Sequence, residues 1–160
     1  MTAEPMPMVT LEMARKIVDA ALAHARELKI RPMAFIVLDR GGQVIAYNRE
    51  DFSGILRFEI AYAKAYGALG MNRSSRAIHE MQKRATGFID SIAAASDGKL
   101  IPSPGGVLIK NREGLILGAV GSTGDAVDAD EACAIKGIHA VGLLSDPPEA
   151  VPPPYAPPMN

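Results

Sequence analysis

The sequence is poor in several features that mark particular classes of protein. Its 160 residues include one cysteine, no tryptophan and only 5% aromatic residues. A single cysteine excludes a framework of internal disulfides, so the chain does not require an oxidising compartment. No apolar run approaches the ~20 residues that span a bilayer, and the N-terminus lacks the basic and apolar regions of a secretory signal. We therefore expect a cytoplasmic protein with no membrane partner.

The sequence also lacks an excess of positive or negative charge and several well-known catalytic motifs. Lysine and arginine number 17 against 18 acidic residues, which gives a net charge of −1, and the basic residues form no run, so we expect no nucleic-acid partner. The chain has no P-loop, dinucleotide fingerprint or nucleophile elbow, which disfavours phosphoryl and hydride transfer. No histidines or cysteines are spaced as metal ligands, and we expect no metal site.

Apolar periodicity and turn signals predict a single α+β domain. The expected helices cover residues 10–28, 55–69, 74–84, 86–95 and 128–144, and the expected strands cover 33–38, 43–48, 107–110 and 115–120. Turn sequences at 39–42 and 111–114 join the strands into two hairpins. The strands alternate little between apolar and polar residues, so this order of elements favours an antiparallel sheet covered by helices on both faces.

The two ends of the chain differ in composition from the rest. We divide the sequence into an N-terminal extension (1–8), a domain (9–145) and a proline-rich tail (146–160). The tail resembles polyproline in composition and is expected to form neither a helix nor a sheet ladder. It is either a disordered end or a strap across a neighbouring subunit, with Tyr155 as its anchor.

A glycine-rich turn joins the last strand of the second hairpin to the final helix. Gly121 and Gly124 flank Ser122 and Thr123, and the following helix begins with acidic residues that include Glu131. Glycine permits positive φ or a close approach of the backbone to a ligand, and the hydroxyls can cap the turn or bind a ligand. The segment is either a small-molecule site or a tight corner without a ligand.

Several of these segments together resemble the GlcG/HbpS family of haem-binding or haem-degrading proteins, which includes the C-terminal domain of PduO. The matching strings are FIVLDRGG at 35–42, RED at 49–51, AYAKA at 61–65, PGG at 104–106, and 118–131 from GAVG to the Asp-Glu pair. The resemblance covers residues 9–143. It implies a profilin-like α-β-α fold with a five-stranded antiparallel sheet, assembly into dimers or octamers, and binding of haem or corrinoid.

The chain departs from the family pattern at two places near this turn. Ser122 and Thr123 stand where the family usually has Val-Ser, and Gly67 stands where threonine is common. Extra hydroxyls and altered packing could suit another ligand. The cofactor therefore stays unassigned, with haem and corrinoid as the family candidates.

Arg49 and Lys64 are the best candidates for binding an anion. Arginine can grip a carboxylate through two hydrogen bonds, and a core-facing lysine is unusual enough to suggest a functional role as a base with a lowered pKa. The alternative for Lys64 is a structural salt bridge to one of three carboxylates. These are Asp39, Asp51 and Glu59.

Histidine and glutamate supply further candidates for moving a proton. His79 lies among basic residues on the third expected helix, and Glu131 is either a general acid/base beside the glycine turn or a partner of the helix dipole. His24 and His139 each lie on the apolar face of an expected helix, the first and the last of the chain. A histidine in such a place is a core or interface residue or, alternatively, a haem or metal ligand. Cys133 is expected to pack in the core.

We expect the ligand site where the glycine turn, Arg49 and the start of the strand after Pro104 converge. The expected ligand-binding residues are Arg49, Gly105, Gly106, Gly121, Ser122 and Thr123, with glycine N–H groups left open for a carboxylate. Two functions remain open. One is a binding protein for a tetrapyrrole or another anionic small molecule; the other is a metal-independent isomerase, lyase or hydrolase that uses Lys64, His79 or Glu131. Alanine-rich helices with few aromatics also predict a homo-oligomer.

Overall fold

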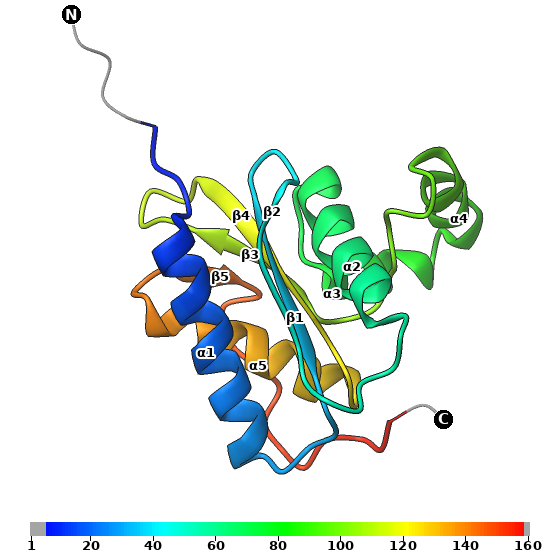
Figure 1. The fold of residues 1–160 in the computed structure, drawn as a ribbon. Helices are drawn as coiled ribbons and strands as arrows, with labels where there is room; N and C mark the ends of the chain where they lie inside the picture. The colour runs from blue at the N-terminus through cyan, green and yellow to red at the C-terminus, as the bar shows by residue number, and fades with distance from the viewer. Residues whose placement is uncertain (1–5, 159–160) are drawn as a thin grey trace, which may run out of the picture.

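A five-stranded antiparallel sheet forms the middle layer of the protein (Figure 1). The computed structural model describes residues 6–158. The strands are β1 (Ala34–Asp39), β2 (Val44–Arg49), β3 (Gly106–Lys110), β4 (Ile116–Thr123) and β5 (Leu144–Asp146). They lie in the order β2-β1-β4-β3-β5, so the two hairpins meet in the centre of the sheet, where β1 pairs with β4.

Helices cover both faces of the sheet, as the sequence predicts for an α+β fold (Figure 1). Helices α1 (Leu11–Glu27) and α5 (Val127–Ala140) pack on one face, against Phe35 and Val37 of β1. Helix α2 (Arg57–Met71) packs on the other, against Ile36 and Leu38, and α3 (Ser75–Gln82) and α4 (Thr86–Ala95) lie beyond it. Burial of alternate residues on opposite faces explains why β1, β3 and β4 are largely apolar, whereas β2 at the edge of the sheet is only partly buried.

Local hydrogen bonds fix the ends of the predicted elements. Thr10 caps α1 by accepting a hydrogen bond from the Met13 N–H at 3.1 Å. In the first hairpin the Asp39 carboxylate accepts from the N–H groups of Gly41 and Gln43 at 2.8 and 3.0 Å. The Asn111 side chain does the same for the Leu115 N–H in the second hairpin, at 2.8 Å. Both hairpin turns were therefore correctly predicted from their residue types.

The end of the domain differs from the sequence prediction. The last helix ends at Ala140 rather than at 144, because Gly142 takes a φ of +75° and the chain reverses. The next residues form β5, whose three residues pair with β3. A strand of this length followed by prolines is too short to show alternation. Its formation depends on the edge that β3 offers.

The proline-rich segment lies on its own domain within the described residues. The Ser145 hydroxyl donates to the Pro147 carbonyl at 2.8 Å, and Ala150 packs against the core under α1 and α5. Tyr155 is half-buried, and Pro158 reaches a hollow at the far end of the sheet. A strap across a neighbouring subunit stays a prediction.

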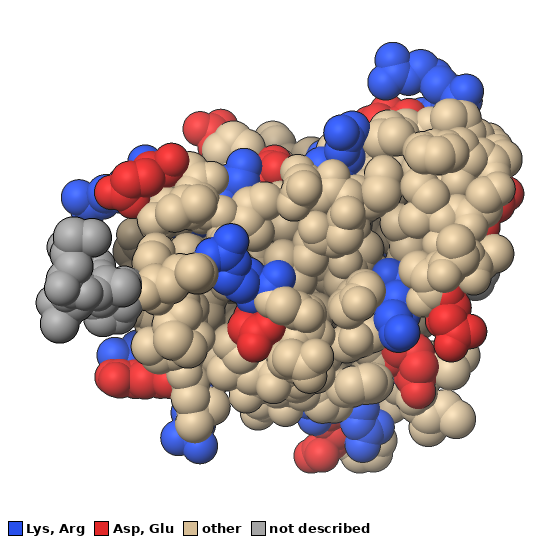
Figure 2. All heavy atoms as spheres, turned by 90° about the horizontal axis from the view of Figure 1, so that it is seen from above, with Lys and Arg blue, Asp and Glu red and all other residues tan. Residues whose placement is uncertain are grey.

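Acidic and basic side chains are mixed on the molecular surface. On the face shown in Figure 2, Lys, Arg, Asp and Glu are scattered singly or in small groups among other residues. Within residues 6–158, no helix has the length and apolar character needed to cross a bilayer.

Candidate functional site

An open hollow of about 340 Å³ lies where the start of α2, the end of β4 and the start of α5 meet. The polar side chains in its wall belong to Arg31, Arg57, Lys64, Ser103, Thr123, Asp125 and Asp130. The hollow lies at the end of the sheet opposite the two hairpin turns, where the glycine-rich segment leaves the sheet. This is the region in which the sequence predicts a site.

Lys64 faces inward and is paired, as predicted, but its partner is Asp130. The two side chains are 4% and 2% exposed, with Nζ 3.1 Å from Oδ2. Nζ also donates to the Ser122 carbonyl at 3.0 Å, and the other oxygen of Asp130 accepts from the Asp125 N–H at 2.9 Å. The prediction of Asp39, Asp51 or Glu59 as partner is wrong, because α2 directs residue 64 toward the end of β4, where α5 begins.

Burial brings the pKa values of Lys64 and Asp130 closer together. It lowers the pKa of Lys64, which the Asp130 carboxylate opposes, and it raises the pKa of Asp130, which the Lys64 ammonium opposes. Loss of water therefore favours the neutral amine and the neutral acid relative to a pair in solvent. Because Nζ and Oδ2 are 3.1 Å apart, the protonation of each group affects that of the other.

Two guanidinium groups at the hollow have no acidic partner. Arg57 donates from Nη1 to the Thr123 hydroxyl at 2.8 Å, and the Arg31 backbone N–H donates to the Asp125 carboxylate at 2.8 Å. Among residues 6–158, no carboxylate oxygen lies within 4.0 Å of a guanidinium nitrogen of either arginine. Arg57 is also the first residue of α2, where the helix dipole disfavours a cation. These positions suit the binding of an external anion.

The predicted glycines gather at this sheet end, but they serve packing. Gly106 pairs with Gly121, as expected for strands joined by the 111–114 hairpin. A Cβ on Gly121 would overlap the carbonyl of Ala61, and one on Gly106 would overlap the carbonyl of Lys64. The glycines thus let α2 approach the sheet closely. The Gly106 N–H donates to the Ser75 hydroxyl at 2.6 Å, which corrects the expectation that it is open to a ligand.

The glycine turn itself is bonded and buried. The Ser122 N–H donates to the Gly105 carbonyl at 2.9 Å, so this group too is taken. The Ser122 hydroxyl is buried and has no hydrogen-bond partner in the described chain. Only Gly105 of the predicted glycines has a positive φ, at +123°. A Cβ there would lie 2.5 Å from the Ser122 carbonyl oxygen and 2.9 Å from Lys64 Nζ, so the lack of a side chain lets the amine reach that carbonyl.

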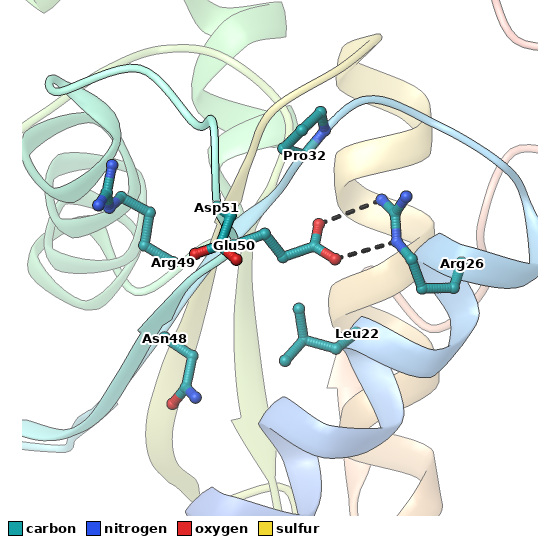
Figure 3. Close-up of a pocket in the computed structure, with 7 residues that line it drawn as sticks. All are labelled: Leu22, Arg26, Pro32, Asn48, Arg49, Glu50 and Asp51. Carbon is teal, nitrogen blue, oxygen red and sulfur yellow. Dashed lines mark hydrogen bonds and ion pairs between the residues drawn. The ribbon is translucent and has the colours of Figure 1, made fainter.

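Arg49 lies on the same face of the sheet as Thr123 but does not line this hollow. Both residues pair across from Ala34, on opposite sides of β1, and Arg49 donates to the Ser53 carbonyl at 3.0 Å. It borders a second pocket of about 460 Å³, shown in Figure 3, in which its side chain points away from that of Glu50.

Glu50 forms an ion pair in this second pocket. Its carboxylate lies 3.0 Å from Nε of Arg26 (Figure 3), and it accepts from the Met33 N–H at 2.7 Å. Glu50 thereby holds the start of β1 against α1. Arg49 and Asp51 border the same pocket without an ion-pair partner among residues 6–158.

Glu131 and His79 lie on neighbouring elements outside the hollow. Glu131 is fully buried, and one of its oxygens accepts from Nε of Arg76 at 2.8 Å. Its other oxygen has no partner among residues 6–158. Burial raises the pKa of Glu131, while Arg76 opposes that rise. The His79 ring bonds the Pro102 carbonyl at 3.0 Å. Their proposed catalytic roles stay predictions.

The remaining histidines bond to residues nearby in sequence. His24 Nδ1 lies 3.1 Å from the Glu27 carboxylate, and His139 Nε2 lies 2.9 Å from the Ser145 hydroxyl. Cys133 is fully buried in the core under α1 and α5, which confirms its predicted packing role. In the described chain, no three His, Cys, Asp or Glu side chains group as metal ligands.

The family model for haem degrading proteins of the HbpS-like type matches residues 9–139. The chain belongs to this HbpS-like family. The match covers four of the five strands and the helices as far as residue 139, so the resemblance seen in the motifs is confirmed.

Individual relatives agree with this assignment. The chain is 28% identical over 123 residues to an uncharacterized 15.0 kDa protein from the dhaT-dhaS intergenic region of Citrobacter freundii, covering 76% of this chain and 84% of that protein. It is 27% identical over 144 residues to the corrinoid adenosyltransferase PduO of the same organism, covering 89% of this chain and only 42% of PduO. A crystal structure of a PduOC–haem complex superposes with a TM-score of 0.77, at 21% identity, over 88% of this chain and 99% of that one. This likeness shows the fold.

Sequence reasoning missed four of the charged residues that line the hollow, which are Arg31, Arg57, Asp125 and Asp130. Asp130 was visible in the acidic start of α5, but its neighbour Glu131 was chosen instead. Only the rotation of α5 on the sheet decides that Asp130 meets Lys64 while Glu131 meets Arg76. The position of Arg57 in the first turn of a helix could have indicated a functional role, because the helix dipole disfavours a cation there. Arg31 carried no such signal.

Proposed function

We propose that this HbpS-like protein binds a small carboxylate-bearing molecule in the hollow beside Arg57. The observation that carries the proposal is the pair of guanidinium groups, Arg31 and Arg57, which line the hollow without a carboxylate partner among residues 6–158. Arginine binds carboxylates through charge-assisted, often bidentate hydrogen bonds. The adjacent Thr123 hydroxyl already accepts from Arg57 and orients its guanidinium.

The size of the hollow limits the ligand. About 340 Å³ is at the lower end of the ~300–1,000 Å³ of small-molecule pockets. It suits a small organic acid held whole, or the propionate end of a tetrapyrrole whose ring lies outside. The haem in the PduOC complex makes a tetrapyrrole the first candidate of the second kind. The metal-independent enzyme remains the alternative, and the buried Lys64–Asp130 pair is the observation that favours it.

Ligand titration on matched arginine variants tests the proposal. Haemin binding is followed by the shift of its Soret band, and succinate binding by calorimetry. Arg57→Gln should weaken whichever ligand binds by about 1.5–3 kcal/mol, the range for a charge-assisted hydrogen bond, or roughly 10- to 150-fold in Kd. Arg112→Gln removes an exposed arginine at the opposite sheet end, in the 111–114 turn, and should bind as the wild type does. Equal affinity in a folded Arg57→Gln protein contradicts the proposal.

We also propose that the protein is a homo-oligomer. The loop before α2 exposes three large apolar side chains, since Phe52, Ile55 and Leu56 are 98%, 90% and 63% exposed. Large apolar groups gathered on a surface mark interaction sites.

A further inference from the structure

Lys64 is one of the residues that line the hollow, and its side chain carries a primary amine. Nζ donates two hydrogen bonds, to the Ser122 carbonyl and to Asp130. Gly105 lies against this amine, since a Cβ there would be 2.9 Å from Nζ and 2.5 Å from the Ser122 carbonyl oxygen. Because Gly105 also has a positive φ of +123°, this position excludes nearly every side chain that would cover the amine.

We propose that Lys64 forms a reversible imine with a small oxo acid, a molecule that carries both a carboxylate and a ketone or aldehyde. This inference rests on the proposed function, because the carboxylate is held by Arg57. The same Arg57 bonds Thr123, the residue after the carbonyl that holds Nζ. The anchoring group and the amine therefore lie on either side of one peptide unit, so a ligand of a few carbons spans both.

Asp130 completes the chemistry as the proton carrier. The neutral amine attacks the carbonyl carbon, a C–N bond forms, and the Asp130 carboxylate, 3.1 Å from Nζ, takes a proton from nitrogen. Asp130 gives this proton to the former carbonyl oxygen, which completes the carbinolamine. It then passes the second proton from nitrogen to the hydroxyl, the C–O bond breaks, and water leaves. The net reaction joins one carbonyl and one amine into one imine with release of one water, so it needs no oxidant or reductant.

Burial supports this role of Lys64. The pKa of the Lys64 amine is lowered by desolvation, which increases the fraction of free amine near neutral pH. Desolvated lysines are the ones that act as nucleophiles toward carbonyl compounds. An exposed surface lysine such as Lys136 lacks both this burial and an adjacent arginine that holds a carboxylate.

Reductive trapping tests the proposal directly. The full chain is incubated with pyruvate or with levulinate, in which the carbonyl is one or three bonds from the carboxylate carbon, and sodium borohydride is added. Intact mass and peptide mapping should show one stable adduct at Lys64 with at least one of the two acids. Succinate, which has no ketone, should give none. No adduct with either acid, or adducts spread over exposed lysines at similar yield, overturns the proposal.

Variants separate a reactive amine from a merely accessible one. Asp130→Asn should slow trapping at least tenfold while the protein still binds succinate. Gly105→Ala should abolish trapping, because its methyl group would overlap both Nζ and the Ser122 carbonyl that holds Nζ. The matched control is Gly98→Ala, which imposes a side chain at a similar positive φ of +78° with nothing within 4 Å. It should trap as the wild type does. Trapping by Gly105→Ala at the wild-type rate contradicts the proposal.

Binding and trapping fail in distinguishable ways. Calorimetry with succinate reports the carboxylate site alone, whereas borohydride reports the imine. Succinate binding that depends on Arg57, without any adduct, overturns the imine and leaves the proposed function intact. An adduct at Lys64 that forms equally well in Arg57→Gln overturns the anchoring role of Arg57 and with it the proposed carboxylate site.

Discussion

At the scale of single residues, the Lys64–Asp130 pair carries the most information. Removing both charges from water costs several kcal/mol per ion, and the attraction between them repays this only with good geometry and further hydrogen bonds. Here each partner has one such bond, to the Ser122 carbonyl and from the Asp125 N–H. A well-packed apolar pair would stabilise the fold as effectively. The pair is therefore better explained by the chemistry of the hollow than by stability.

Cys133 allows a sharp test of burial at the same scale. Burial raises the pKa of its thiol from 9.0 to about 12. Because the folded pKa lies above the unfolded one, the stability that the protonated thiol contributes is complete below pH 9 and is lost as pH rises from 9 toward 12. Between pH 8 and pH 10, the wild type should lose about 1.4 kcal/mol more unfolding free energy than Cys133→Ala.

Urea unfolding of both proteins at the two pH values measures this difference, and the other titrating groups cancel in the comparison. In the native protein, the thiol should also fail to react with a disulfide reagent at pH 8, and it should react once urea unfolds the chain. A native thiol that reacts as fast as free cysteine would show that Cys133 is not buried.

At the scale of elements, glycines decide how closely α2 lies on the sheet. Gly121 in β4 faces the Ala61 carbonyl, and Gly106 in β3 faces the Lys64 carbonyl. Both carbonyls are so close that a Cβ on the glycine would overlap them. This approach brings Lys64 within reach of Ser122 and Asp130. The packing of one helix on two strands therefore sets the geometry of the hollow.

Gly121→Ala tests this packing role. Its methyl group must push the backbone of α2 away from β4, and overpacking of this kind costs about 1–3 kcal/mol. The control is Gly70→Ala, an exposed site near the end of α2 with nothing within 4 Å, which should be neutral or should gain up to ~1 kcal/mol of helix propensity. Thermal and urea unfolding compare the two. Equal stability of both variants contradicts the packing role of Gly121.

At the scale of the whole molecule, one surface region remains without a partner in the single chain. The exposed loop before α2 continues into a row of aromatic side chains. The Phe58 ring meets the Tyr47 ring edge-on, with 5.0 Å between the ring centroids, and it stacks with the Tyr62 ring at a centroid distance of 5.9 Å. The rings bury part of each other's surface, yet Phe58 is still 39% exposed. In the proposed homo-oligomer, a second copy of the chain covers this region.

Light scattering on charged variants tests the proposed assembly. The wild type should have a mass above that of the 16.9 kDa chain at micromolar concentration, and Ile55→Asp should lower the mass, because a buried carboxylate at an interface is costly. Phe88→Asp, at an exposed site on α4, serves as the control and should leave the mass unchanged. A monomeric wild type contradicts the proposal, and a monomer only in the Phe88 variant moves the interface to α4.

The sequence by itself determined the fold class, the hairpins and most helix ends. These features depend on local causes, such as the Thr10 cap, the Asp39 and Asn111 side chains that close the turns, and apolar runs long enough to show their period. The motifs were also sufficient for the family. The apolar neighbours of Lys64 on its helix further indicated that this lysine is buried, and a buried ammonium needs an acidic partner.

Only the tertiary structure decided which groups meet. Asp130 rather than Asp39 pairs with Lys64, and Arg57 rather than Arg49 lines the hollow. These outcomes depend on the rotation of α2 and α5 about their own axes, and in a helix the next residue points about 100° away. Spacing along the chain fixes which residues share a helix face, but the packing of that face against the sheet selects the residue that reaches the site.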